Sequence, residues 1–447
     1  MNDKQRTIDM LHGPLAWKIL LFTIPIALSS MVQQLFNAAD LAVVGMFNDA
    51  NALAAVGANT EIVAFIVTVS GGLSVGANLL VAGKIGRGEN KKLGGAACSA
   101  LFLALLIGIL GELAGQLAVK PLLELMQAPA TILPDAQRYL RIYLLAFPFL
   151  LLYDFESALL RACGDSRYPF VVLVISGIVN VILNLIFVAG LRMGVAGVAT
   201  ATAISTILSA VIVFLRLQRD ERFAFDPRRL TVSRKDMAVI LKFGIPTAVQ
   251  GAVFSFSNLF IQSAVNTYGE TAIAGSTIAI NFEYFTYYII TAFGQAVTTF
   301  AGQNCAAGQW KRCRQIFGWS LLFALVCSCI PIFTIVAFRS TFCGMFTSDS
   351  AVIEAACVRI LCILFYEPIS NLYEIPAGFM RGTGHPVYPA AAMMVGTCAF
   401  RILWILTAYG AHPSLVMLYH AYPLSYLTTM LLVGVGFFLR WKRGLAA

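Results

Sequence analysis

The stretch LLRACGDSRYP, residues 159–169, recurs in the second half of the chain as FMRGTGHPVYP, residues 379–389. The recurrence places Arg161 opposite Arg381, at an offset of 220 residues. Two further pairs of stretches follow the same order at nearly the same offset: LLFTIP (20–25) with LKFGIP (241–246), and VAGKIGRGENKK (81–92) with FAGQNCAAGQWKR (300–312). Three matches in one order indicate that the chain consists of two copies of one ancestral unit.

The composition is that of a membrane protein. The 447 residues are 59% hydrophobic and only 12% charged, and the mean hydropathy is +0.80, well outside the range of soluble domains. Apolar stretches of about 18 residues or more, enough to cross about 30 Å of hydrocarbon, recur about twelve times. The predicted spans are 15–46, 52–81, 94–118, 135–162, 168–191, 195–217, 237–267, 273–303, 315–338, 353–380, 386–409 and 416–440.

The basic residues give the expected orientation in the bilayer. The net charge is +9, and about 24 of the 31 Lys and Arg residues fall in the N-terminus, the even-numbered loops and the C-terminus. This alternation argues against a nucleic-acid partner and, by the positive-inside rule, predicts that both termini are cytoplasmic. We therefore expect a multi-pass protein of the plasma (inner) membrane. The first apolar run continues directly as a helix, so no cleavable signal peptide is expected.

The duplication and the spans together predict the fold. Six spans in each half with the same orientation imply two copies related by an axis along the membrane normal, an arrangement found in secondary transporters. The expected fold is an all-α polytopic membrane protein with 12 transmembrane helices in two six-helix bundles. Its predicted parts are an N-terminal lobe (1–217), a cytoplasmic linker (218–236) and a C-terminal lobe (237–447).

The first predicted span contains a carboxylate. Gln33, Asn37 and Asp40 recur at steps of three and four residues, so they share one face of the helix. A charged side chain at the bilayer centre costs about 2.5–3.5 kcal/mol on insertion scales, so Asp40 is expected to face the bundle or a water-filled cavity. Such an acid can bind and release a proton, or it can simply link helices through hydrogen bonds. Pro25, a bending point in the same helix, favours a moving part.

Other polar residues within the spans are candidate binding groups. The substrate-binding candidates of the first half are Gln33, Asn37 and Asp154. Asp154, on the fourth span, is assigned to an inner vestibule, with a simple ion pair to Arg161 as the alternative. In the second half, carboxylates and aromatic faces could hold an organic cation. The substrate-binding candidates there are Asn258, Gln262, Glu283, Tyr287 and Glu367. Glu374 is predicted to pair with Arg381.

Several motifs resemble a known family. GDSRYP after LLRA, NVILNLIF (180–187), MGVAGVATATAIS (193–205) and FAGQNCAAG (300–308) are similar to signatures of multidrug and toxic compound extrusion (MATE) transporters. QQLFNAAD (33–40) resembles the first helix of the DinF-like branch. The resemblance implies a V-shaped pair of six-helix bundles and a cation-coupled antiporter that exports amphipathic, often cationic compounds.

The resemblance also implies a cation-coupling site. In the DinF-like branch an acid on the first helix, an Asn and an Asp on the fifth and a Thr on the sixth form this site. The matching positions here are Asp40, Asn180, Asn184 and Thr202. Asn184 stands where the branch has an aspartate, which removes one negative charge and weakens a sodium site at Asp40, Asn180 and Thr202. The expected coupling ion is H+ or Na+, with no other cofactor.

Two other functions are less consistent with the sequence. A flippase of a lipid-linked precursor, in the same superfamily, should have a basic central cavity for phosphates, whereas the candidates here are mostly acidic or neutral. An enzyme is not expected, because the chain has only four His residues and no HExxH motif. A monomer is the default for this architecture.

Overall fold

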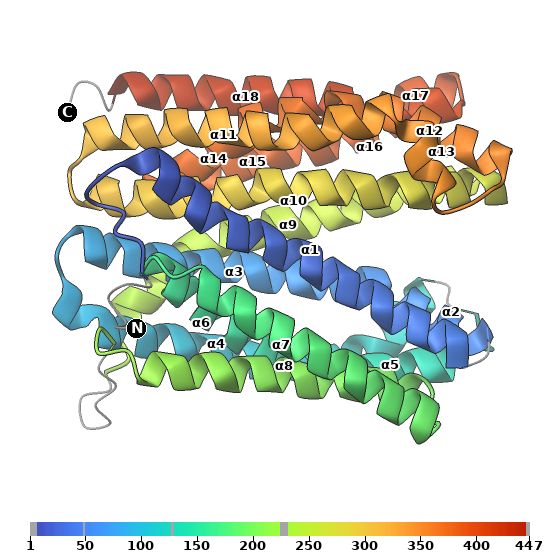
Figure 1. The fold of residues 1–447 in the computed structure, drawn as a ribbon, viewed down its shortest axis with the longest axis horizontal. Helices are drawn as coiled ribbons and strands as arrows, with labels where there is room; N and C mark the ends of the chain where they lie inside the picture. The colour runs from blue at the N-terminus through green and yellow to red at the C-terminus, as the bar shows by residue number, and fades with distance from the viewer. Residues whose placement is uncertain (1–6, 48–49, 127–128, 224–230, 444–447) are drawn as a thin grey trace. The chain divides into compact units, whose positions relative to one another are not determined.

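The computed structural model describes residues 7–47, 50–126, 129–223 and 231–443 (Figure 1). Every regular element in these residues is helical, which confirms the predicted all-α fold. The first half contains α1 (Leu15–Phe47), α2 (Ala50–Ala58), α3 (Thr60–Gly86), η2 (Asn90–Lys92), α4 (Leu93–Leu125), α5 (Leu133–Leu145), α6 (Phe147–Ala162), α7 (Arg167–Asn184), η3 (Leu185–Gly190) and α8 (Val195–Gln218).

The second half repeats this series with more interruptions. It contains α9 (Arg234–Asn266), α10 (Glu270–Ala306), α11 (Trp310–Ala337), α12 (Arg339–Gly344), α13 (Ser350–Cys362), η4 (Leu364–Ser370), α14 (Asn371–Gly382), α15 (Val387–Met393), η5 (Met394–Ala399), α16 (Phe400–Trp404), η6 (Ile405–Tyr409), α17 (Leu415–Tyr419) and α18 (Ala421–Arg443).

Long apolar helices dominate the chain. Within the described residues, nine helices are long and apolar enough to cross a membrane, and the bent pair α5 and α6 would make ten. The predicted spans 273–303 and 353–380 fall on α10 and on the broken series α13, η4 and α14, which carry several charged side chains. The chain is therefore a multi-pass membrane protein.

Contacts divide the chain into two units, and two helices change unit along their length. Unit 1 comprises Met1–Asp9 and Leu28–Ala248, and unit 2 comprises Met10–Ala27 and Val249–Ala447. The predicted lobes 1–217 and 237–447 differ from these units, because they place α1 and α9 each within one lobe. The part 224–230 of the predicted linker lies outside the described residues.

The switch between units follows a proline in each helix. Pro25 lies inside α1 and Pro246 inside α9. In both helices the boundary between the units comes two residues after the proline, at Ala27 and at Ala248. The two prolines that the internal repeat places opposite each other thus mark equivalent points of the structure.

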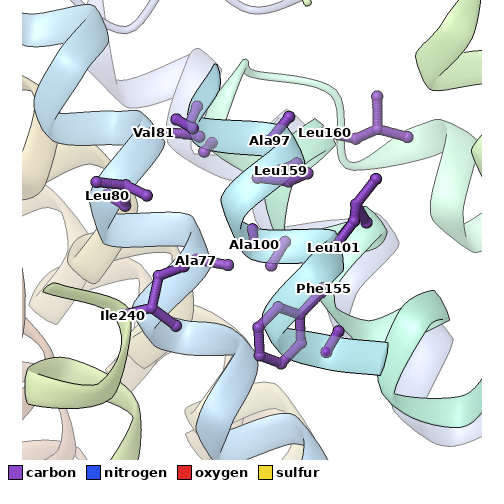
Figure 2. Packing of buried hydrophobic residues seen from close by; sticks show 14 of the residues in the cluster. Ala77, Leu80, Val81, Ala97, Ala100, Leu101, Phe155, Leu159, Leu160 and Ile240 are labelled. Atoms are coloured by element: carbon purple, nitrogen blue, oxygen red, sulfur yellow. The ribbon is translucent and has the colours of Figure 1, made fainter. Parts of the chain in front are cut away.

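Small residues explain why the first part of α9 belongs to unit 1. A Cβ atom added at Gly72 of α3 would lie 2.5 Å from Cα of Ala248, and one at Gly76 would collide with the carbonyl oxygen of Ile240. Glycines four residues apart let two helix backbones approach this closely. The fully buried Ile240 packs beside Ala77 in the hydrophobic core of unit 1 (Figure 2).

The internal repeat also holds at the level of single turns. Gly164 and Gly384, at equivalent positions, have φ of +87° and +95°. After each glycine the next amide donates a hydrogen bond back into the preceding helix, from Asp165 to Leu160 at 3.0 Å and from His385 to Met380 at 2.9 Å. These are glycine-terminated helix ends of one type, as the duplication predicts.

The two glycines provide a matched stability test. Alanine in this left-handed conformation costs about 1–3 kcal/mol, and at Gly164 the new Cβ would also collide with the carbonyl oxygen of Ile8, whereas nothing lies within 4 Å at Gly384. We therefore expect Gly164→Ala to lower the free energy of unfolding in detergent more than Gly384→Ala does. Equal losses would show that the contact with Ile8 contributes nothing to stability.

Candidate functional site

The carboxylate of Asp40 lies in unit 1 between three helices. Its side chain is 9% exposed. Nδ2 of Asn184, at the end of α7, donates to Oδ1 of Asp40 at 2.6 Å, and Oγ1 of Thr202, on α8, donates to Oδ2 at 3.2 Å. The same hydroxyl lies 3.0 Å from the carbonyl oxygen of Val198, so Oδ2 of Asp40 shares its donor whereas Oδ1 has the amide of Asn184.

Asn180 closes the hydrogen-bond network around the acid. Nδ2 of Asn184 also donates to Oδ1 of Asn180 at 3.2 Å, and Nδ2 of Asn180 donates to Oγ1 of Thr202 at 3.3 Å. Oδ1 of Asn184 is buried and has no partner among the described residues. The π-helical segment η3 begins directly after Asn184, and such turns are frequent at functional sites. The structure thus brings the four predicted coupling residues into one network.

A cavity of about 100 Å³ opens beside this network, enough for several water molecules. Its lining includes the predicted residues Gln33, Asn37, Asp40, Asn180 and Thr202. Asn184 lies behind the lining and is fully buried. The acid therefore faces a cavity lined by both polar and apolar side chains on one side and the packed bundle on the other.

Asp154 is placed elsewhere in unit 1. Oγ of the buried Ser70 donates to Oδ2 of Asp154 at 2.6 Å. The residue is not among those that line the cavity beside Asp40. Its predicted role in binding a substrate stays a prediction.

In this arrangement an amide N–H donor lies among the oxygens of the network. Sodium needs several oxygen ligands directed at one point, as hard cations do. Here the amide nitrogen of Asn184 lies between the oxygens of Asp40 and Asn180, so it occupies the position between them that a cation would take.

Replacing the central amide tests this interpretation. In Asn184→Asp a second carboxylate would lie in place of the donor, next to Asp40, and two such close acids cannot both stay ionised without a cation. We expect Asn184→Asp to make transport in liposomes dependent on sodium at fixed pH. Asn281→Asp, which adds the same charge at an exposed position of α10 away from this network, should not. An unchanged response to sodium in Asn184→Asp would contradict the interpretation.

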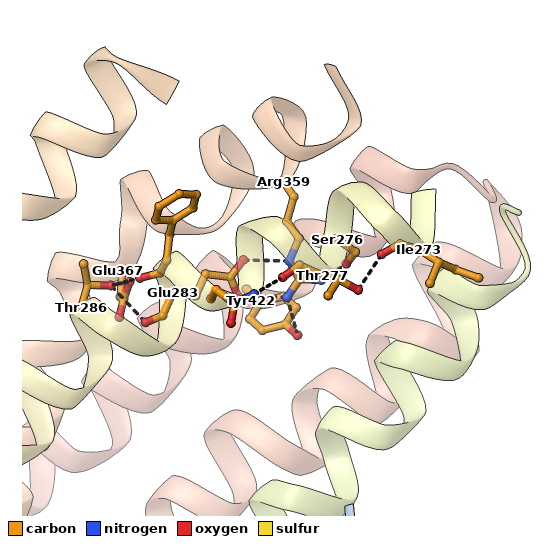
Figure 3. Close-up of polar contacts among 10 residues, drawn as sticks. Ile273, Ser276, Thr277, Glu283, Thr286, Arg359, Glu367 and Tyr422 are labelled. Carbon is orange, nitrogen blue, oxygen red and sulfur yellow. Dashed lines mark hydrogen bonds and ion pairs between the residues drawn. The ribbon is translucent and has the colours of Figure 1, made fainter. Parts of the chain in front are cut away.

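In unit 2 the predicted cation ligand Glu283 already has a cationic partner (Figure 3). Nε and Nη2 of Arg359 donate to the two carboxylate oxygens of Glu283 at 2.7 and 2.9 Å. Nη1 of Arg359 donates to Oγ of Ser276 at 2.7 Å. Because the pair is neutral as a whole, Glu283 is not a free acid in this arrangement.

The other predicted residues of unit 2 have neutral partners or, like Asn258, an arginine. Glu367 is 2% exposed and accepts from Oγ1 of Thr286 at 2.7 Å. The ring of Tyr287 stacks on Phe254 with centroids 6.3 Å apart. The remaining contacts join Gln262 Nε2 to Asn266 Oδ1 at 3.0 Å, Arg401 Nη1 to Asn258 Oδ1 at 3.1 Å, and Arg381 Nη2 to Glu374 Oε1 at 2.7 Å. The last contact confirms the predicted ion pair.

Sequence reasoning missed the two arginines Arg359 and Arg401. Both are at most 2% exposed and lie within predicted spans, 353–380 and 386–409. The signal was present, because an arginine inside an apolar span is itself a sign of a partner or a function.

Comparisons with known proteins agree with this architecture. The model of the MatE family matches residues 25–186 and 246–410. A probable multidrug resistance protein of Bacillus subtilis is 23% identical over 441 residues, covering 96% of this chain and 95% of the relative. Another of Thermotoga maritima is 26% identical over 407 residues, covering 88% and 86%.

Solved structures share the fold. A transporter of the MOP superfamily from Pyrococcus furiosus matches with a TM-score of 0.88 and 21% identity, over 98% of this chain and 97% of that one. A MATE structure described as the bent conformation matches with the same score, identity and coverage. Since the family model covers most of the chain, the protein belongs to the MatE family of multidrug efflux transporters.

Proposed function

We propose that this protein exports amphipathic organic compounds, many of them cationic, in exchange for protons. The observation that carries the proposal is the carboxylate of Asp40, which lies in a membrane-spanning helix beside a cavity and accepts hydrogen bonds from Asn184 and Thr202. Relatives named multidrug resistance proteins support the class of cargo.

The proton is the proposed coupling ion. A protonated Asp40 carries no charge and gains one O–H donor. With the proton on Oδ2, Oδ1 can still accept from Asn184, but the hydroxyl of Thr202 has to turn from donor to acceptor. That change shifts the balance between two conformations only if their contacts to Asp40 differ. Binding of sodium here would require the amide nitrogen of Asn184 to move away from its position between Oδ1 of Asp40 and Oδ1 of Asn180.

Pro25 is the proposed bending point of α1. A proline removes one helical hydrogen bond and is a common cause of kinks. It lies fifteen residues before Asp40 on the same helix, and the boundary between the two units follows it. Protonation at Asp40 would therefore act on the helix that joins the units, as alternating access requires.

Orientation and assembly complete the proposal. The excess of Lys and Arg in alternate loops supports cytoplasmic termini in the cell membrane. The bilayer and small amphipathic molecules are the proposed partners, and a monomer is sufficient for the mechanism.

Liposomes test the function. Purified protein is reconstituted with a fluorescent lipophilic cation, and a proton gradient and a sodium gradient are imposed in separate experiments. We expect the proton gradient alone to drive accumulation of the cation. Transport driven only by sodium would refute proton coupling, and accumulation under neither gradient for a panel of cationic dyes would refute the proposed export of cations.

A further inference from the structure

Arg401 is a buried arginine without an acidic partner. It is 1% exposed, and among the described residues it takes part in no ion pair. The other two buried arginines of unit 2, Arg359 and Arg381, each contact a glutamate at 2.7 Å. Charges inside proteins are normally paired, so the isolated guanidinium calls for an explanation.

The surroundings of Arg401 are neutral and aromatic. Nε donates to Oγ of Ser425 at 3.0 Å and Nη1 donates to Oδ1 of Asn258 at 3.1 Å. The guanidinium lies 4.1 Å from the centroid of the Tyr422 ring and 5.6 Å from that of Phe254. A guanidinium has five N–H donors, and Nη2 donates to no described residue, so part of its capacity is unused.

The internal repeat relates these residues to the cavity of unit 1. Subtracting the offset of 221 residues takes Asn258 on α9 to Asn37 on α1. Subtracting 220 takes Ser425 on α18 to Ser205 on α8. Both counterparts line the cavity beside Asp40. The cluster around Arg401 therefore occupies the counterpart of that cavity, with the opposite charge.

The same relation shows how the lining has changed. Three aromatic residues of unit 2 stand where unit 1 has polar residues of the cavity lining. At these offsets the pairs are Phe254 with Gln33, Tyr422 with Thr202, and Tyr426 with Thr206. Arg401 lies in α16 between the two π-helical segments η5 and η6. Such segments are frequent at functional sites, and one also follows Asn184 in unit 1.

We propose that the cluster of Arg401, Asn258, Phe254, Tyr422 and Tyr426 is an anion-binding site that takes the carboxylate of an aromatic compound. The fork of the guanidinium fits a carboxylate. The rings provide stacking partners for an aromatic body. Phe254 and Asn258 are only partly buried, so a ligand can approach over them.

The proposal extends the cargo to aromatic carboxylates and zwitterions, and this extension rests on the proposed export function. The binding of such a compound does not depend on the export function, because binding can be measured without a gradient. A zwitterion could place its carboxylate at Arg401.

The test compares 2-naphthoate with its neutral amide, 2-naphthamide, by equilibrium dialysis against the purified full chain in detergent. We expect naphthoate to bind the unaltered protein at least about tenfold more tightly than naphthamide, the ratio expected for a hydrogen bond to a charged group. Arg401→Gln should lose this preference. Equal affinity for the two probes in the unaltered protein, or an unchanged preference in folded Arg401→Gln, would overturn the proposal.

Two further variants keep the test decisive. Phe254→Leu leaves Arg401 in place and should weaken the binding of naphthoate about threefold or more, because it removes a ring contact. This variant decides the outcome if Arg401→Gln does not fold. An unchanged affinity of Phe254→Leu for naphthoate would then refute the site. Ser209→Leu, which reduces the space in the cavity of unit 1 without changing the network around Asp40, should bind naphthoate normally. If it binds less, the probe occupies the cavity of unit 1 instead, and the proposal fails while the export function stands.

Discussion

Asp40→Asn is expected to reduce proton-driven accumulation of a lipophilic cation to the level of protein-free liposomes. The amide has the shape of the carboxylate and can still accept a hydrogen bond from Asn184, so the fold should be retained. It cannot take up or release a proton, so the step that couples the gradient to the conformational change is lost. Initial rates of dye accumulation and the melting temperature of the purified variant measure the two effects.

Asp154→Asn is the matched control. It also removes one intramembrane acid, but Asp154 accepts from Ser70 and does not line the cavity beside Asp40. We expect Asp154→Asn to keep most of the proton-driven transport. Unimpaired coupled transport in Asp40→Asn would remove Asp40 from the mechanism, whereas equal losses in both variants would point to the total intramembrane charge.

Arg359→Met is expected to lower the free energy of unfolding by about 3–5 kcal/mol, the usual effect of removing one partner of a buried ion pair. Both side chains are shielded, with Arg359 2% and Glu283 13% exposed. The variant leaves Glu283 without its cation in a membrane-spanning part of unit 2, and Ser276 also loses its contact with Nη1. Unfolding in mixed detergent micelles measures the change.

Lys120→Met provides the control for this prediction. Lys120 pairs with Glu124 at 3.8 Å, but both side chains are more than half exposed. Exposed pairs contribute about 0–1 kcal/mol, so this variant should be nearly neutral. The double variant Arg359→Met with Glu283→Leu should recover much of the lost stability, because no charge is then left alone. An effect of Arg359→Met as small as that of Lys120→Met would contradict the assigned pair.

The internal repeat made much of the fold predictable, because equivalent glycines and prolines have equivalent places. Gly164 and Gly384 share a conformation, and Pro25 and Pro246 precede equivalent boundaries. The change of unit within α1 and α9 could not be predicted from hydropathy, which counts apolar residues but does not say against which helix they pack. Gly76 on α3 was the local signal for that contact.

The candidate site was predictable only in unit 1. Residues at helical spacing and a family resemblance led to Asp40 and Asn184, and these side chains are in contact. In unit 2 the prediction rested on the acidic residues within the spans, and it took Glu283 to be a carboxylate without a cationic partner. Its partner Arg359 lies 76 residues away in sequence, and only the packing of α10 against α13 brings the two together.

The most direct test of the central claim is the movement of protons caused by the cargo itself. Liposomes that contain the protein and a pH-sensitive dye receive an outward gradient of a lipophilic cation, with no proton or sodium gradient imposed and the membrane potential clamped. Proton exchange at Asp40 predicts that the liposome interior acidifies with the unaltered protein and not with Asp40→Asn. Export of the cation without acidification, or acidification that persists in Asp40→Asn, would contradict it.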